Sequence, residues 1–186
     1  MKFNWNITGD YDYASTQVNL PEAIAKRVMD WGKENIPDDE ISDTDENQGR
    51  EDNPHITILY GIVDQSPQPV IDLLQGKPQV KATLGKISIF ENDDYDVVKI
   101  GVESDDLAEF QEIIWDEVEH ESDYPEYKPH VTIAYVKPGS GSLYSGSTEF
   151  EGTEIIFDTV VFSSSDNEKT DIPLSSGIAA SLSWSV

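Results

Sequence analysis

The sequence predicts an α+β fold in which two pseudo-symmetric lobes of antiparallel sheet have helices packed outside them and a central cleft between them. Segments rich in β-branched and aromatic residues, typical of strands, alternate with segments of helical spacing. The order strand, helix, polar link, strand occurs twice along the chain, which indicates an internal repeat. A pseudo-twofold pairing of the two units around a shared cleft is the simplest architecture that explains this repeat.

The first unit combines a strand, a helix and an acidic link before its second strand. Its elements are a strand at 16–20, a helix that starts at Pro21 and ends near 32–37, a loop at 37–53 and a strand at 55–63. In the helix, Ile24, Val28 and Trp31 lie on one face, and a proline suits a first helical turn. The closing strand, HITILYGIV, has the composition of a buried strand.

The second unit repeats this order after additional elements. The predicted elements are a short helix at 67–75, strands at 80–90 and 96–102, a helix at 104–120, a polar link at 121–129 and a strand at 130–136. The helix has an apolar stripe of Leu107, Phe110, Ile114 and Val118, and Ser104 or Asp105 can cap its amino end. A loop at 137–142, a strand at 154–163 and a last strand at 181–186 complete the chain, which we expect to form a single domain over residues 1–186.

Composition limits the classes of partner. The formal net charge is -25, so the surface repels polyanions, and we expect no long nucleic acid as a partner. A small phosphorylated ligand in a locally basic pocket is compatible with this charge. The chain has no cysteine, which excludes disulfides and thiol nucleophiles, and no apolar run long enough to span a membrane. We therefore expect a soluble, cytoplasmic protein and no membrane partner; the oligomeric state is not predicted.

Two His-x-Thr pairs, His55/Thr57 and His130/Thr132, stand at the start of the two closing strands. Side chains alternate across a strand, so each histidine shares a face with its threonine. The opposite faces are expected to hold Ile56, Ile58 and Tyr60 in the first strand and Val131, Ile133 and Tyr135 in the second. If the repeats face each other, two imidazoles and two hydroxyls converge.

This set of groups suits the cleavage of a phosphodiester. In-line attack needs a base for the attacking hydroxyl or water, an acid for the leaving oxygen and donors for the phosphoryl oxygens. One neutral and one charged histidine can supply the base and the acid near neutral pH, and threonine hydroxyls can hold the oxygens. No metal or other cofactor is required, and the remaining histidine, His120, lies beside acidic residues at a helix end.

The paired PHITILYG and PHVTIAYV segments, each preceded by a helix, resemble the two-histidine (2H) phosphoesterase superfamily, which includes RNA ligase-like cyclic phosphodiesterases. The resemblance covers about residues 16–163. It implies two pseudo-symmetric lobes and cleavage of cyclic or 2',5'-type phosphodiesters without metal. Carried over by motif position, it implies His55 and His130 as acid and base, in an order left open, and Thr57 and Thr132 as phosphate ligands.

Within that superfamily, the PHITILYG form and the AYVKPG run are most similar to phage-type members. These include the anti-CBASS phosphodiesterases, which degrade cyclic oligonucleotide immune signals. The resemblance thus implies a small cyclic or short oligonucleotide substrate and a host-virus role in the host cytoplasm. The acidic segment 38–52 and the Ser-rich tail have no counterpart in it.

Four further residues are candidates for substrate binding. Tyr11 and Tyr13 can stack on a nucleobase, although tyrosines near a terminus also serve simple packing. Asp158 can orient a ligand or a histidine, or be a solvated surface acid. Lys137 directly follows the second motif and can neutralise phosphate, or be an exposed loop lysine.

Three other functions fit the same residues. The first is opening of 2',3'-cyclic phosphates at RNA ends, which a basic track toward the cleft would favour. The second is a module that binds a cyclic nucleotide without cutting it, although binding alone does not need two titrating imidazoles. The third is an interaction protein whose acidic surface meets a basic partner, with the two histidines far apart.

Overall fold

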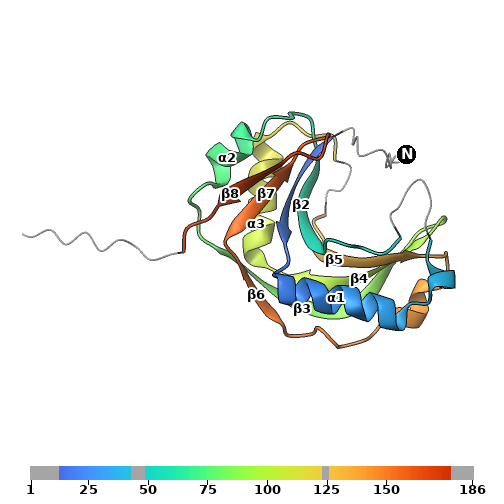
Figure 1. Ribbon diagram of the computed structural model, residues 1–186. Coiled ribbons are helices and arrows are strands. Elements are labelled where there is room, and N and C mark those ends of the chain that lie inside the picture. The colour runs from blue at the N-terminus through green and yellow to red at the C-terminus, as the bar shows by residue number, and fades with distance from the viewer. Residues whose placement is uncertain (1–12, 43–48, 123–125, 177–186) are drawn as a thin grey trace, which may run out of the picture.

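The computed structural model describes residues 13–42, 49–122 and 126–176. The strands are β1 (Ala14–Asn19), β2 (His55–Ile62), β3 (Val80–Glu91), β4 (Asp96–Glu103), β5 (His130–Val136), β6 (Glu154–Phe157), β7 (Thr159–Ser163) and β8 (Lys169–Pro173). The helices are α1 (Glu22–Asn35), α2 (Gln68–Leu74) and α3 (Asp105–Glu117), with 3-10 turns η1 (Asp38–Glu40) and η2 (Gly141–Tyr144). All strands join one sheet, which is strongly curled (Figure 1).

The strand order β6-β3-β4-β5-β2-β1-β7-β8 divides into two matching halves. The strands β2 and β5 are neighbours at the middle, and each is flanked on its outer side by the strand that starts its own repeat, β1 or β4. This arrangement confirms the predicted α+β fold and its two pseudo-symmetric units. The units share one continuous antiparallel sheet.

The two ends of the sheet meet at Asp158. Phe157 of β6 pairs with Val80 at one end of the strand order, whereas Thr159 of β7 pairs with β8 at the other end. The prediction of one strand over 154–163 is therefore wrong, because the curl lets consecutive residues join opposite ends of the sheet. The sequence also missed β8, a short and largely polar edge strand. The predicted strand at 181–186 lies outside the described residues.

Each repeat places its helix against the central strand of the other repeat. Helix α1 lies along β5, where a Cβ atom added at Gly32 would be only 3.0 Å from Cγ2 of Ile133. Helix α3 lies against β2 and β3, and the Ser104 hydroxyl caps it by accepting a hydrogen bond from the Leu107 amide at 3.0 Å. This confirms Ser104 as the cap. The crossed packing ties the two units together.

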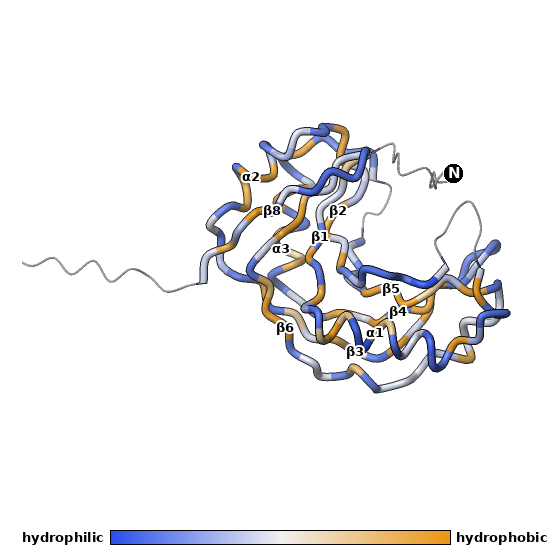
Figure 2. Tube along the Cα trace, viewed as in Figure 1, coloured by the Kyte–Doolittle hydropathy of each residue, from blue (hydrophilic) through white to orange (hydrophobic). Residues whose placement is uncertain are grey.

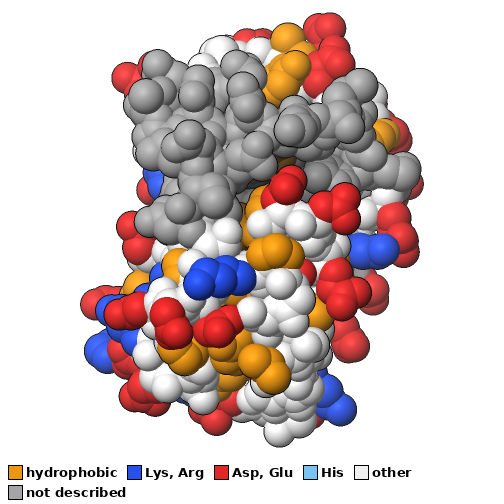
Figure 3. Space-filling model, turned by 90° about the vertical axis from the view of Figure 1, so that its right-hand side faces the viewer, with side chains coloured by type: hydrophobic (Ala, Val, Ile, Leu, Met, Phe, Trp, Pro, Cys, Tyr) orange, Lys and Arg blue, Asp and Glu red, His pale blue; other side chains and the backbone are white. Residues whose placement is uncertain are grey.

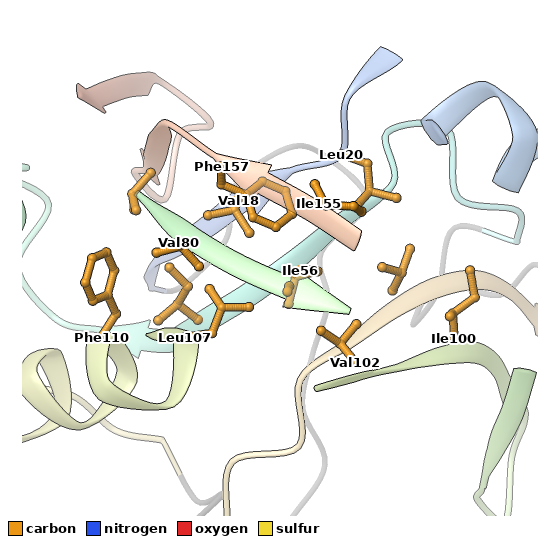
Figure 4. Packing of buried hydrophobic residues seen from close by; sticks show 14 of the residues in the cluster. Val18, Leu20, Ile56, Val80, Ile100, Val102, Leu107, Phe110, Ile155 and Phe157 are labelled. Carbon is orange, nitrogen blue, oxygen red and sulfur yellow. The ribbon is translucent and has the colours of Figure 1, made fainter. Parts of the chain in front are cut away.

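The core lies between the sheet and these helices (Figures 2 and 4). Ile56 of β2 and Leu107 and Phe110 of α3 point into it, together with residues from β1, β3, β4 and β6. Burial of an aliphatic or aromatic side chain of this size contributes roughly 1.5–3 kcal/mol, so the core fixes the central strands firmly. Among the described helices, none is long and apolar enough to cross a membrane.

Candidate active site

The two motifs meet where β2 and β5 pair. Ile56 pairs with Val131 in antiparallel register, and both side chains are fully buried. In an antiparallel pair, residue numbers rise along one strand as they fall along the other. His55 therefore lies beside Thr132, and Thr57 lies beside His130. All four lie half-buried on the face opposite to Ile56 and Val131, which we call the site face. The structure thus brings together His55, Thr57, His130 and Thr132, the His–Thr quartet.

Both imidazoles are held in the same way. His55 Nδ1 lies 2.9 Å from the Asn53 carbonyl oxygen, and His130 Nδ1 lies 2.8 Å from the Lys128 carbonyl oxygen. A carbonyl oxygen can only accept, so each Nδ1 carries the proton and donates it. Each Nε2 is then the nitrogen that takes up or gives off a proton in chemistry. Neither threonine hydroxyl is used in a hydrogen bond to another described residue.

The electrostatic surroundings of the two histidines differ. Burial lowers the pKa of His130, and the positive charges of Lys99 and of His55 lower it further, against a raising effect of the bond to Lys128. His55 also has an acidic neighbour, Glu51. Burial raises the pKa of Glu51, and the attraction of His55 opposes this rise. A pair of imidazoles with unlike surroundings is suited to separate base and acid roles.

A β-bulge follows the threonine in each central strand. Thr57 pairs with Gln17 and Leu59 with Thr16, so Ile58 is an extra residue in β2. In β5, Thr132 pairs with Lys99 of β4 and Ala134 pairs with Val98, so Ile133 is the extra residue. The bulge in β2 is stabilised by the buried Thr16 hydroxyl, which accepts a hydrogen bond from the Leu59 amide at 3.2 Å.

These bulges reset the alternation of side chains, so Tyr60 and Tyr135 point to the site face. The expectation that both tyrosines lie on the opposite face is wrong, because one extra residue moves all later side chains to the other face. Each ring meets a second tyrosine edge-on. Tyr60 lies 6.2 Å from Tyr13, and Tyr135 lies 5.4 Å from Tyr95, measured between ring centroids.

Lys99 is a site residue that the sequence analysis missed. It pairs with Thr132 from the neighbouring strand β4 and is only 9% exposed. Its Nζ donates to the Ser88 hydroxyl at 2.9 Å and lies 4.1 Å from the ring centroid of Phe90. Phe90 in turn meets the His130 ring edge-on at 5.0 Å. The sequence signal was a lysine inside the apolar strand DVVKIGVE.

The other predicted residues lie at several places. Tyr13 contacts Tyr60 as described, and Tyr11 lies outside the described residues. Lys137 is exposed directly after β5, and Asp158 is exposed at the seam between β6 and β7, where it accepts a hydrogen bond from the Thr159 hydroxyl. In the strand order, β3 and β4 separate β6 from β5, and β1 separates β7 from β2, so Asp158 lies outside the central pair of strands. Substrate-binding roles for these residues stay predictions.

Asp96 and Tyr127, which the sequence analysis did not single out, hold segments next to the site by hydrogen bonds. Asp96 is 2% exposed, and one of its carboxylate oxygens accepts hydrogen bonds from the Gly139 and Gly141 amides, both at 2.9 Å. This contact fixes the loop that contains Lys137.

The Tyr127 hydroxyl donates to the Thr57 carbonyl oxygen at 3.0 Å, and burial raises the pKa of that hydroxyl. In the described part of the chain, no three acidic or histidine side chains are placed to hold a metal ion.

Solved structures share this fold at low sequence identity. TT0787 of Thermus thermophilus is 14% identical, with a TM-score of 0.59 over 86% of this chain and 97% of its own. E. coli LigT complexed with 3'-AMP is 14% identical, with a TM-score of 0.58 over 89% of this chain and 96% of its own. A third structure, described as a phosphoesterase, has a TM-score of 0.52 and 13% identity over 88% of this chain and 96% of its own.

No curated protein matches this sequence. The family model of the 2'-5' RNA ligase superfamily, in contrast, matches residues 21–141. That match covers well over half of the chain and includes both His-x-Thr pairs, α1 and α3. This protein therefore belongs to the 2'-5' RNA ligase superfamily.

Proposed function

We propose that this protein is a metal-independent phosphodiesterase that hydrolyses small cyclic or 2',5'-linked nucleotide phosphodiesters. His55 and His130 act as the acid and the base, and Thr57 and Thr132 bind the phosphoryl oxygens. The observation that carries the proposal is the His–Thr quartet. Both imidazoles have Nδ1 fixed by a backbone carbonyl, and among the described residues neither Nε2 atom and neither threonine hydroxyl has a hydrogen-bond partner.

The quartet contains each group that the reaction needs. A neutral imidazole removes the proton from an attacking hydroxyl or water as the new O–P bond forms. The bond from phosphorus to the leaving oxygen breaks on the opposite side, and that oxygen takes a proton from the other imidazole. The threonine hydroxyls donate to the remaining phosphoryl oxygens. One proton enters and one leaves the site, so exchange with solvent restores both histidines.

We propose a cyclic oligonucleotide as the substrate, of the kind that anti-CBASS phosphodiesterases degrade as immune signals. Tyr60 and Tyr135 extend the site face from opposite ends of the quartet, because β2 and β5 are antiparallel. Two aromatic residues so placed suit a phosphodiester with a nucleobase on each side, since a base gains about 1–3 kcal/mol by stacking on an aromatic ring. Tyr13, and Tyr11 before it, are proposed to add to the first of these stacking surfaces.

The charge of the protein favours a short substrate. The net charge is -25, and acidic side chains are spread over the face in Figure 3 with few basic ones among them. Such a surface repels long RNA but has less effect on a small ligand that enters one site. Lys137, on the loop held by Asp96, is proposed to neutralise part of the phosphate charge.

The second candidate is hydrolysis of 2',3'-cyclic phosphates at RNA ends. It is favoured by the structural similarity to E. coli LigT, which has been solved with 3'-AMP, a single ribonucleotide. This reaction would use the same quartet but needs only one nucleobase at the site. The two reactions therefore differ in whether the second tyrosine contributes.

A panel of substrates tests the proposal. It contains cyclic di- and trinucleotides with 3',5' or 2',5' linkages and nucleoside 2',3'-cyclic phosphates, all assayed in EDTA. We expect the cyclic oligonucleotides to be cut with the highest kcat/KM. Preference for 2',3'-cyclic phosphates would favour the second candidate, and tight binding without cleavage would identify a binding module. If nothing on the panel is bound or cut, the proposal is wrong.

A further inference from the structure

The His–Thr quartet is symmetric, but the strands beside it carry different charges. Thr132 is flanked by Lys99 of β4, and the position related to it by the pseudo-twofold, beside Thr57, holds Gln17 of β1. Both side chains are largely buried, at 9% and 7% exposure. The repeat therefore has a cation on one side of the site and a neutral amide on the other.

The charge of Lys99 is not neutralised within the described residues. No ion pair joins it to a carboxylate there, although the chain has 37 acidic residues. Its neighbours are the Ser88 hydroxyl, the Phe90 ring and, at longer range, the positive charge of Lys128. Lysines are rarely buried without a partner, because desolvation of the ammonium group costs several kcal/mol. A buried lysine of this kind is suited to an anion that arrives with the substrate.

We propose that Lys99 binds a phosphoryl oxygen of the substrate from the side of Thr132 and His130. This inference rests on the proposed function and extends it. The attacking oxygen gives its proton to Nε2 of one imidazole as the O–P bond forms. Nε2 of the other imidazole gives its proton to the leaving oxygen as the second P–O bond breaks. Lys99 balances the negative charge on the phosphoryl oxygens and keeps its own proton throughout.

The test compares wild type with Lys99→Gln, which introduces the residue found at the pseudo-symmetric position, and with Lys99→Met and Lys99→Arg. The matched control is Lys81→Gln, because Lys81 is exposed on β3 away from the quartet. Binding of inorganic phosphate and the pH titration of the His130 ring are followed by NMR, and kcat/KM is measured against pH. The two neutral variants remove a buried charge, so we expect them to stay folded, which a thermal melt checks.

We expect phosphate to bind at least tenfold more weakly to the Gln and Met variants and normally to the Arg and Lys81 variants. Loss of the Lys99 charge should raise the pKa of His130, so the limb of the kcat/KM profile that depends on His130 should move to higher pH. Unchanged phosphate binding, or an unchanged His130 titration, in Lys99→Gln would overturn the inference. Because both NMR readouts need no turnover, a wild type without phosphodiesterase activity would refute the proposed function separately.

Discussion

Ile56 and Val131 pair across β2 and β5 at the centre of the molecule, and each stands between the histidine and the threonine of its own motif. This single antiparallel pair relates the two repeats. It turns two sequence motifs that are far apart in the chain into one His–Thr quartet. The buried side chains of Ile56 and Val131 fix the register, because a slip of either strand by one residue would expose its apolar side chain and turn its histidine and threonine into the core.

The first prediction concerns the threonine hydroxyls. Thr57→Val and Thr132→Val keep the shape of the side chain and remove the donor to the phosphoryl oxygen. Each is expected to lower kcat on the best substrate of the panel by on the order of 10²-fold, as found when one such donor is removed. Thr148→Val, at an exposed position outside the sheet, serves as the control. Equal rates for wild type and both site variants would show that the hydroxyls do not bind the transition state.

The second prediction separates one-base from two-base substrates. Tyr135→Ala should raise KM for a cyclic dinucleotide by about tenfold or more, because loss of one stacked base costs about 1–3 kcal/mol. Tyr135→Phe keeps the ring and should change KM little. The same comparison at Tyr60 should give the same result. If only one of the two alanine variants weakens binding, a single-nucleotide substrate becomes the better account.

The third prediction concerns the loop after β5. Asp96→Ala removes the shared acceptor of the Gly139 and Gly141 amides. We expect the free energy of unfolding to fall by about 3 kcal/mol, since hydrogen bonds to charged groups contribute roughly 1.5–3 kcal/mol each. Urea denaturation measures this change. Asp93→Ala, in the exposed turn before β4, should stay within about 0.5 kcal/mol of wild type.

The fourth prediction is a pH-dependent gain of stability in Glu51→Gln. Burial raises the pKa of Glu51 above its ordinary value, so the folded state holds this proton more tightly than the unfolded state. Stability that depends on the protonated carboxyl is thus lost as the pH rises through the folded-state pKa. The glutamine variant is neutral throughout and keeps an oxygen for the Asn53 amide. Its Tm should exceed that of wild type at about pH 8, and the gain should vanish below about pH 4. A gain of equal size at both pH values would contradict this account.

The sequence predicted those features that depend on local periodicity. The apolar stripe of α3 and its Ser104 cap, and the alternation of the first residues of β2 and β5, are patterns within a few residues of one another. For that reason each histidine could be placed on one strand face with its own threonine before the pairing of the strands was known. The family resemblance then connected this face with phosphodiester chemistry.

The missed features depend on pairing between distant segments. The bulges at Ile58 and Ile133 exist only relative to β1 and β4, so no pattern within β2 or β5 could show that Tyr60 and Tyr135 turn to the site face. The break at Asp158 depends on the curl of the whole sheet. Lys99 became a site residue only when its partner Thr132 was known.

Hydrolysis of the best panel substrate in EDTA by His55→Ala, His130→Ala and the double variant tests most directly that both pairs form one active site. His120→Gln is the control, since His120 bonds to the Trp115 carbonyl oxygen away from the quartet. Each single alanine variant should lower kcat by roughly 10²–10⁴-fold, and the double variant should be little worse than either, because the two imidazoles act as a unit. His120→Gln should keep nearly full activity. Full turnover in either His55→Ala or His130→Ala would contradict the shared site.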